Sequence, residues 1–181
     1  MEISRNRPAL RAGVLLVGLF VAACGTTPSA TPAAQSDLEL GLAAHVAGDY
    51  DTALTHYENA LEEDPNNKFA HYNIGLIDQL TNRMEEAEAS YRAALEIDPD
   101  YVPALFNLAI VRTQADDFEE AVELYQRVIE LQPDRAGAHL NLGLALVQLD
   151  RTEEGEAAIQ RAIELDPTLA VQDETPASPS P

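Results

Sequence analysis

Apolar residues recur along most of the chain with the spacing of an amphipathic helix. An apolar period near 3.6 residues runs for about 14 positions, pauses at a short polar turn, and resumes for about 14 more. The turns read "AGDYD", "TNRME", "ADDFE" and "LDRTE". A proline follows each second run, where its missing N–H and its ring end or displace the helix. The pattern therefore predicts a series of helical hairpins.

The hairpins repeat with a fixed period of 34 residues. That period separates the prolines, which are Pro65, Pro99, Pro133 and Pro167. The text before each is alike: "HYENALEEDP", "SYRAALEIDP", "LYQRVIELQP" and "AIQRAIELDP". One hairpin cannot bury its apolar stripe, but stacked neighbours can. We therefore expect an all-α array with a continuous core.

Small and bulky residues recur at matching positions of these units. A small residue follows an apolar one at Leu40-Gly41, Ile74-Gly75, Leu108-Ala109 and Leu142-Gly143. The second helices carry a small residue at Ala53, Ala87, Ala121 and Gly155, and a bulky one four positions later at Tyr57, Tyr91, Tyr125 and Ile159. Gly155 stands where the other three repeats have alanine, and glycine inside a helix is expected to cost about 1 kcal/mol of stability relative to alanine. Asp37, where the repeat family that this pattern resembles often has an aromatic residue, suggests a degenerate, solvent-facing first repeat.

This pattern resembles the tetratricopeptide repeat over residues 34–167. The resemblance implies four repeats (34–67, 68–101, 102–135 and 136–167) that form a right-handed α-solenoid, with the first helix of each repeat lining a concave groove. The implied groove residues are Leu38, Leu42, Phe69, Tyr72, Asn73, Leu76, Phe106, Asn107, Ile110, Leu140, Asn141 and Leu144. None of these positions carries Lys or Arg, which argues against a receptor for a partner's C-terminal carboxylate.

Three asparagines lie 34 residues apart in this groove, at Asn73, Asn107 and Asn141. A carboxamide offers two donors and an acceptor, so this row can hydrogen-bond the backbone of a bound protein segment. The same side chains can instead bond within the array, and both interpretations stay open. The occupant can be an extended segment or a helix.

The first 23 residues have the order of a secretory signal. Arg5, Arg7 and Arg11 precede an apolar or small-residue run over residues 12–23, which is too short to cross a bilayer, since about 20 residues are needed. The junction Val21-Ala22-Ala23-Cys24 resembles the lipobox of bacterial lipoprotein precursors. The alternatives are an ordinary signal peptide that happens to contain a cysteine, or a buried thiol in a cytoplasmic protein.

The lipobox resemblance implies that Cys24 becomes the lipidated first residue of the mature chain. Residues 24–36 would then form a flexible tether, and residues 168–181 a disordered, proline-rich tail. Gly25 follows the anchor where retention in the inner membrane usually needs aspartate, so in a diderm bacterium we expect the outer membrane, facing the periplasm. Lipidation would consume the only cysteine and leave no disulfide.

Charge and missing motifs narrow the function further. The chain has 11 basic and 31 acidic residues, a net charge of −20, which disfavours nucleic acid and favours basic partners. It contains no HExxH, phosphate loop, GxSxG or calcium loop. His71 and His139 hold equivalent positions, which suggests helix packing, and His45 and His56 are read as packed or solvated. We expect no catalysis, metal or cofactor.

No recognisable helix follows Pro167 to cap the array. We therefore expect partial exposure of Ile159, Ala162 and Ile163, although the following "TLAVQ" can give partial cover, and either a homo-oligomer or a docked partner at that end. The most consistent function is a membrane-anchored scaffold of the bacterial envelope that binds another envelope protein. Narrower alternatives are a pilot protein of pilus or secretion-system assembly, an adaptor for cell-wall hydrolases, or the targeting part of an enzyme, against which the short flanks argue.

Overall fold

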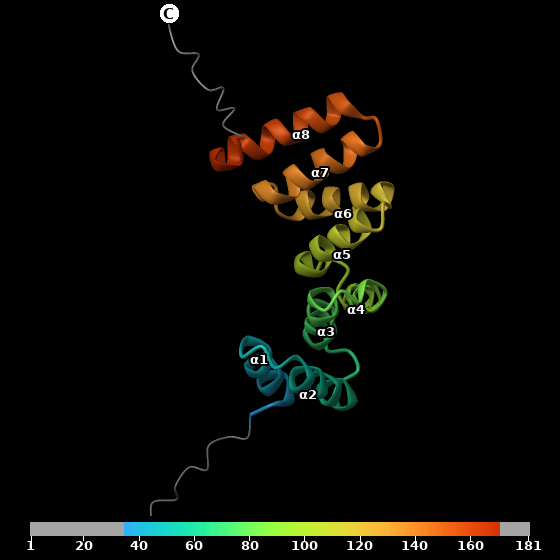
Figure 1. The fold of residues 1–181 in the computed structure, drawn as a ribbon, viewed down its shortest axis with the longest axis vertical. Coiled ribbons are helices and arrows are strands. Elements are labelled where there is room, and N and C mark those ends of the chain that lie inside the picture. The colour runs from blue at the N-terminus through green and yellow to red at the C-terminus, as the bar shows by residue number, and fades with distance from the viewer. Residues whose placement is uncertain (1–34, 171–181) are drawn as a thin grey trace, which may run out of the picture. The chain divides into compact units, whose positions relative to one another are not determined.

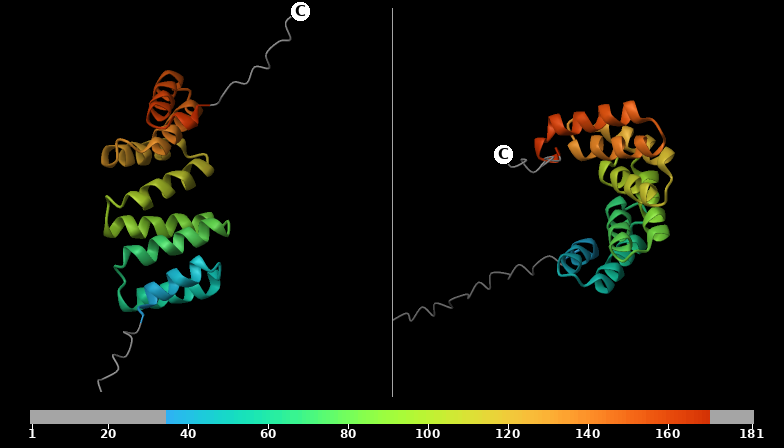
Figure 2. Two further views of the ribbon diagram at one scale, coloured as in Figure 1. Left: turned by 90° about the vertical axis from the view of Figure 1, so that its left-hand side faces the viewer. Right: turned by 45° about the horizontal axis from the view of Figure 1, so that its top comes forward.

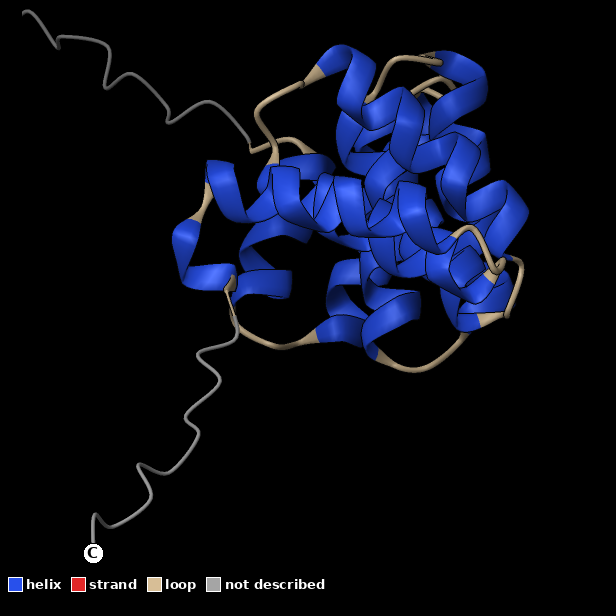
Figure 3. Ribbon diagram, turned by 90° about the horizontal axis from the view of Figure 1, so that it is seen from above, coloured by secondary structure: helices blue, strands red, loops and turns tan. Residues whose placement is uncertain are grey.

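The computed structural model describes residues 35–170, which contain only helices, turns and loops (Figures 1 and 3). The helices are α1 (Asp37–Val46), α2 (Tyr50–Glu63), α3 (Lys68–Leu80), α4 (Met84–Ile97), α5 (Val102–Gln114), α6 (Phe118–Leu131), α7 (Ala136–Gln148), α8 (Thr152–Leu165) and the 3-10 helix η1 (Pro167–Leu169). The predicted all-α array of helical hairpins is confirmed. The signal sequence, Cys24, most of the tether and nearly all of the tail lie outside the described residues.

Each helix packs against the next one in the chain, and the first helices of neighbouring hairpins also touch, α1 with α3 and α3 with α5. The hairpins stack in sequence order (Figure 1), and the stack of residues 35–170 curves, as the right-hand view of Figure 2 shows. Among these residues, no helix combines the length and apolar character needed to cross a bilayer.

Side chains and prolines set the helix boundaries. Ser36 and Glu39 form a reciprocal capping box at the start of α1, which satisfies two otherwise unpaired backbone N–H groups. Asp49, Asn67 and Asp117 accept backbone N–H bonds at the starts of α2, α3 and α6. The second helices end before the Asp-Pro or Gln-Pro pairs, as the proline rule predicts.

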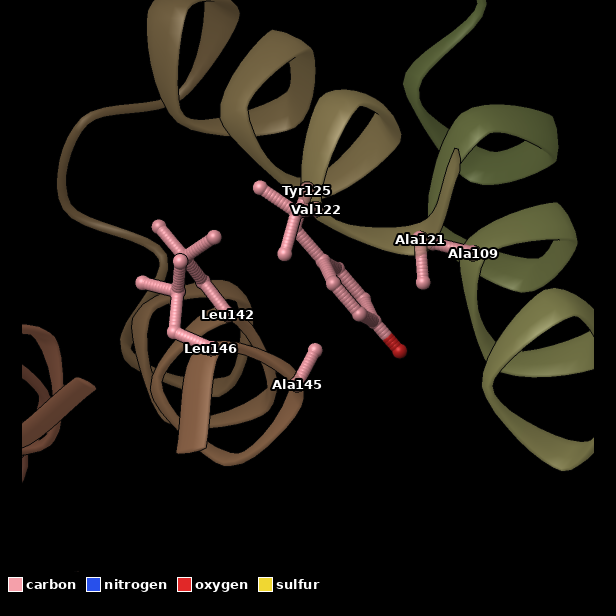
Figure 4. Close-up of a cluster of buried hydrophobic side chains, with 7 residues drawn as sticks. All are labelled: Ala109, Ala121, Val122, Tyr125, Leu142, Ala145 and Leu146. Atoms are coloured by element: carbon pink, nitrogen blue, oxygen red, sulfur yellow. The ribbon is translucent and has the colours of Figure 1, made fainter. Parts of the chain in front are cut away.

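Both helices of the hairpins contribute to the core, and the second helices of the first three repeats supply its recurring alanine and tyrosine. Ala53, Ala87 and Ala121 are fully buried. At most 1% of the surface of Tyr57, Tyr91 or Tyr125 is exposed. Figure 4 shows the Tyr125 side chain extending from α6 into the space between Ala109 of α5 and Ala145 of α7. The recurring bulky residue is therefore the wedge around which consecutive helices pack.

The recurring glycines make room for that wedge. A Cβ on Gly41 or Gly75 would lie 2.6 Å from the Tyr57 ring or 2.7 Å from the Tyr91 ring. In the last repeat, where isoleucine replaces tyrosine, the helices come closer: a Cβ on Gly155 would lie 2.8 Å from the backbone oxygen of Gly143. The expectation that alanine would suit position 155 better is wrong, because the packing of α7 on α8 leaves no space for a methyl group.

Two expectations about the ends of the array are corrected. Asp37 is not simply solvent-facing: its carboxylate lies 2.7 Å from Nδ1 of His56, and this bond lowers the pKa of Asp37. At the other end, η1 packs on α8 and Ala162 is fully buried, while Ile159 and Ile163 are half-buried. The expected exposure of Ala162 is therefore wrong.

Candidate functional site

The predicted groove residues lie on the first helices of the hairpins, and none is buried. Leu42, Phe69 and Leu144 are the most exposed, at 52%, 47% and 51%. The other groove residues are partly exposed: Leu38, Tyr72, Asn73, Leu76, Phe106, Asn107, Ile110, Leu140 and Asn141. The helical register thus leaves accessible apolar side chains at equivalent positions of α1, α3, α5 and α7.

Two of the three asparagines already have a bond within the array. Asn73 donates from Nδ2 to the Phe69 backbone oxygen at 2.7 Å, and Asn107 donates to the Tyr72 hydroxyl at 3.2 Å. These amides therefore bond inside the repeats. This favours the interpretation that the asparagines bond within the array over the interpretation that they bind the backbone of a partner segment. Apolar side chains provide the larger part of the accessible groove.

Aromatic side chains of the groove pack against their neighbours in two groups. Tyr72 lies edge-on to Tyr101 with ring centroids 5.4 Å apart, and Phe106 lies 5.9 Å from Tyr125. Burial raises the pKa of both Tyr72 and Tyr125, and their hydrogen bonds with Asn107 and Thr113, respectively, only partly offset the rise. Their hydroxyls therefore stay protonated at neutral pH and remain available for hydrogen bonds.

Sequence reasoning missed two apolar groove residues, Val46 and Leu80. They are 82% and 62% exposed, and each follows a groove leucine, Leu42 or Leu76, by one helical turn. The i, i+4 spacing on one helix face could have identified both. With Leu42 they extend the apolar surface of the first two repeats toward the ends of α1 and α3.

Sequence reasoning also missed a cation at the groove edge. Arg135 precedes α7, and its guanidinium carbon lies 4.0 Å from the centre of the Phe106 ring, a cation–π geometry. Lys68, at the start of α3, lies near the Phe69 and Tyr101 rings and pairs with Asp98 at 2.5 Å. Both cations hold aromatic rings in place at the starts of the first helices.

A pocket lies between α5 and α7. It has a volume of about 310 Å³ and is lined by Ile110, Thr113, Gln114, Tyr125, Asn141 and Leu144. Three of these are predicted groove residues, and Thr113 and Tyr125 bring hydroxyl groups whose oxygens lie 3.4 Å apart. Apolar walls with a few fixed polar groups are typical of a site that takes one side chain of a partner.

Three family models match the repeated region. Two models described as tetratricopeptide repeat match residues 67–134 and 106–170, and one described as TPR repeat matches residues 41–79. The chain carries tetratricopeptide repeats. The 34-residue hairpins, the alanine and tyrosine wedge and the exposed first-helix surface follow this family's architecture, which supports a role as a protein–protein interaction scaffold.

Solved structures of MamA share this repeat fold. One crystal structure of MamA is 20% identical, with a TM-score of 0.68 over 73% of this chain and 77% of that chain. Residues 41-end of MamA from Desulfovibrio magneticus RS-1 are 23% identical, with a TM-score of 0.66 over 76% of both chains. At this identity the likeness concerns the fold alone. No curated protein matches the chain in sequence.

The histidines have structural contacts. His71 and His139 lie at equivalent positions, and their Nε2 atoms are 3.1 Å and 2.9 Å from the backbone oxygens of Pro65 and Pro133. Each thus ties the start of a tetratricopeptide first helix to the proline before it. Within residues 35–170, no group of three or more His, Cys, Asp or Glu side chains is placed to hold a metal ion.

The C-terminal helix offers less free surface than the sequence suggests. Ile159 packs against the position of Gly143, since a Cβ there would lie 2.6 Å from its Cγ1. Ala162 is buried, and Ile159 and Ile163 are the half-buried apolar residues of the predicted patch. A homo-oligomer formed through α8 stays a prediction.

Proposed function

We propose that this protein is a membrane-anchored scaffold that binds another envelope protein through the groove of its tetratricopeptide repeats. The observation that supports this most is the row of apolar side chains at equivalent positions of the first helices, in which Leu42 and Leu144 are each more than half exposed. An exposed apolar surface of this kind, flanked by charged turns, is typical of a protein-interaction site.

Binding would rest on burial of the apolar row rather than on the asparagines. Burying an exposed leucine contributes about 1.5–3 kcal/mol, whereas Asn73 and Asn107 each already donate one hydrogen bond within the repeats. The repeats are rigidly packed, so little ordering cost falls on the scaffold itself. The partner therefore needs a segment with apolar side chains at intervals that match the repeats.

Replacing two exposed leucines of the groove tests this proposal. We expect Leu42→Gln combined with Leu144→Gln to reduce the amount of partner captured by at least about tenfold, because each substitution removes an apolar contact. Glutamine is a good helix former, so the thermal midpoint should stay within about 2 °C of wild type. The measurement is a quantitative pull-down from detergent-solubilised envelope, with circular dichroism to follow folding.

Ala89→Gln provides the matched control, since it places the same polar side chain on an exposed position of α4, a second helix. It should retain every partner that wild type retains. If the folded leucine double variant also keeps every partner, the groove is not the binding surface.

The anchor part of the proposal rests on the lipobox-like junction before Cys24, the only cysteine of the chain. Two or more acyl chains hold a protein stably on a membrane, at about 0.8 kcal/mol per buried CH₂. The outer membrane, facing the periplasm, is the location that Gly25 favours in a diderm cell. The groove would then recruit its partner to that surface.

Cys24→Ser should remove the anchor. We expect wild type to incorporate labelled palmitate and to enter the detergent phase of a Triton X-114 separation, and the variant to do neither, because serine lacks the thiol that carries the diacylglyceryl group. The matched control is Ser29→Ala, five residues into the tether. Palmitate labelling of the Cys24→Ser protein would show that the anchor lies elsewhere or is not a thioether-linked lipid.

A further inference from the structure

Within residues 35–170, Arg135 is the only lysine or arginine that forms no ion pair. The others each pair with an Asp or Glu carboxylate, and they are Lys68, Arg83, Arg92, Arg112, Arg127, Arg151 and Arg161. Arg135 stays unpaired although Asp134 precedes it in the chain and acidic residues outnumber basic ones by 31 to 11. A shortage of acids therefore does not explain its free charge.

The residue that could neutralise Arg135 is a glutamine. The residue before the repeat proline is Gln132 in the third repeat, whereas the other repeats have Asp64, Asp98 and Asp166 there. Lys68, which also lies near aromatic rings, pairs with Asp98 at 2.5 Å. Arg135 instead donates from Nη1 to Oε1 of Gln132 at 3.3 Å. Its guanidinium thus keeps its full charge and has further N–H donors available.

The charge of Arg135 acts on side chains of the groove. The guanidinium carbon lies 4.0 Å from the centre of the Phe106 ring, and that ring packs against Tyr125, which lines the pocket between α5 and α7. Burial raises the pKa of Tyr72, while the hydrogen bond from Asn107 and the positive charge of Arg135 oppose the rise. The cation therefore lies close to groove residues of repeats two and three.

We propose that the groove binds a partner segment in which an Asp or Glu side chain pairs with Arg135 while an adjacent apolar side chain packs on Phe106. This inference rests on the proposed function and adds the chemistry of the partner. The planar guanidinium matches a carboxylate, because two parallel N–H donors can bind its two oxygens.

The carboxylate belongs to a side chain rather than to the end of the partner. Apolar groove residues lie on both sides of Phe106 along the array, with Leu76 in repeat two and Leu144 in repeat four. A segment that covers this row continues past Arg135 in both directions, so its acidic residue lies in the interior of the segment.

The net charge of −20 does not prevent this pairing. Exposed charges more than about 8 Å apart are largely screened at physiological ionic strength, whereas a half-buried cation such as Arg135 is screened less. A segment with one acidic residue among apolar ones therefore meets little long-range repulsion. A basic segment, which the net charge alone favours, is the competing outcome of the test.

A selection from a random twelve-residue peptide display library on the mature full-length chain tests this inference. We expect selected peptides to contain an apolar residue next to Asp or Glu. Synthetic versions carry an amidated C-terminus, so that side chains provide their only carboxylates. By fluorescence anisotropy, they should bind Arg135→Gln about three- to tenfold more weakly than wild type, because a partly exposed charge pair contributes modestly. Arg135→Lys, which keeps the charge, should recover part of that loss.

Changing the acidic residue of the peptide separates charge pairing from packing on Phe106. A peptide with Gln in place of Glu, or Asn in place of Asp, should bind wild type more weakly by the same factor. It should bind Arg135→Gln as tightly as the acidic peptide does, because the interacting pair is already broken. A peptide substitution that costs the same factor in wild type and in Arg135→Gln would overturn the pairing.

Gln132→Glu neutralises Arg135 without removing it. The new carboxylate has the size of the amide that Arg135 already reaches at 3.3 Å, so it should compete with the acidic residue of the peptide. We expect a similar loss of peptide affinity and a thermal midpoint within about 2 °C of wild type. The matched control is Arg161→Gln, which removes a cation from an exposed pair on α8 and should leave the affinity unchanged.

The outcomes separate this inference from the proposed function. Selected peptides that lack Asp and Glu, or that bind Arg135→Gln and Gln132→Glu as tightly as wild type, overturn the inference. If those peptides still lose affinity for the Leu42→Gln, Leu144→Gln variant, the groove function stands. Peptides insensitive to every groove substitution, or no selected peptide at all, count against both.

Discussion

We expect Gly155→Ala to lower the free energy of unfolding by about 2–3 kcal/mol, although alanine is the better helix former. The added methyl carbon would lie 2.7 Å from Cγ2 of Val147 and 2.8 Å from the Gly143 backbone oxygen. The valine can rotate away, but the backbone oxygen can move only if α7 and α8 separate. The measurement is urea denaturation followed by far-UV circular dichroism.

Gly137→Ala provides the control for this prediction. Gly137 lies in the first turn of α7, and the nearest atom to its added Cβ would be Cζ of Phe106 at 3.9 Å, an ordinary contact. This variant should be as stable as wild type or slightly more stable, because alanine restricts the unfolded chain. Equal stabilities for the two alanine variants would contradict the close packing of α7 on α8.

The hairpin architecture was predictable from the sequence because its signals are local. These signals are a 3.6-residue apolar period, a polar turn and a proline every 34 residues, and each acts within one or two helices. They recur often enough to define where each helix begins and ends. The assignment of the groove residues to the first helices came from the resemblance to the tetratricopeptide repeat. The helical register could have identified Val46 and Leu80, which lie one helical turn after predicted groove residues.

The details that sequence reasoning missed depend on distances between helices. Gly155 looked unfavourable because helix propensity ignores a neighbouring backbone, and only the packing of α7 on α8 shows why a methyl group is excluded. Ala162 looked exposed because no α-helix follows it, yet a single turn of 3-10 helix lies against α8. Both depend on contacts that a one-dimensional pattern does not contain.

The contacts of polar side chains were equally hard to predict. The asparagine row reads as a ladder of free amides until the bonds of Asn73 to its own helix and of Asn107 to Tyr72 are known. Arg135 precedes its helix and so falls outside the helical register, and its place over the Phe106 ring depends on how repeats three and four pack. Charge counts alone do not show which of the few cations contact the groove.

The ion-pair network around Arg112 carries the second large prediction. Arg112 of α5 is 18% exposed in its side chain and pairs with Glu88 of α4, with Asp117, and with Glu120 of α6. Arg92 is the only other cation of the network. We expect Arg112→Met to lower the free energy of unfolding at pH 7 by about 2–3 kcal/mol, because three partly buried carboxylates would then share one cation. Chemical denaturation measures the loss.

The matched control is Arg161→Met, which breaks an exposed pair with Glu164 on α8 and should cost less than about 1 kcal/mol. If Arg112→Met lowers the free energy of unfolding by no more than Arg161→Met does, the partly buried network contributes no more to stability than an exposed ion pair.

The cost of Arg112→Met should also depend on pH, in a direction that the pKa values fix. Burial by itself would raise the pKa of Glu88, but hydrogen bonds from Arg92 and Arg112 outweigh it and hold that pKa below its usual value. The hydrogen bond from Arg112 likewise lowers the pKa of Asp117. A carboxylate whose pKa is lower in the folded chain than in the unfolded chain stabilises the fold when the pH is above its unfolded-state pKa, near 4. That contribution is lost as the pH falls through the folded-state pKa.

The difference in stability between wild type and Arg112→Met should therefore be full at pH 7 and shrink below about pH 4, as protonation removes the carboxylate charges that Arg112 neutralises. Denaturation curves at pH 7, 5, 4 and 3 measure this trend. A difference that stays constant across this range would mean that Arg112 stabilises repeats two and three by packing of its side chain rather than by its charge.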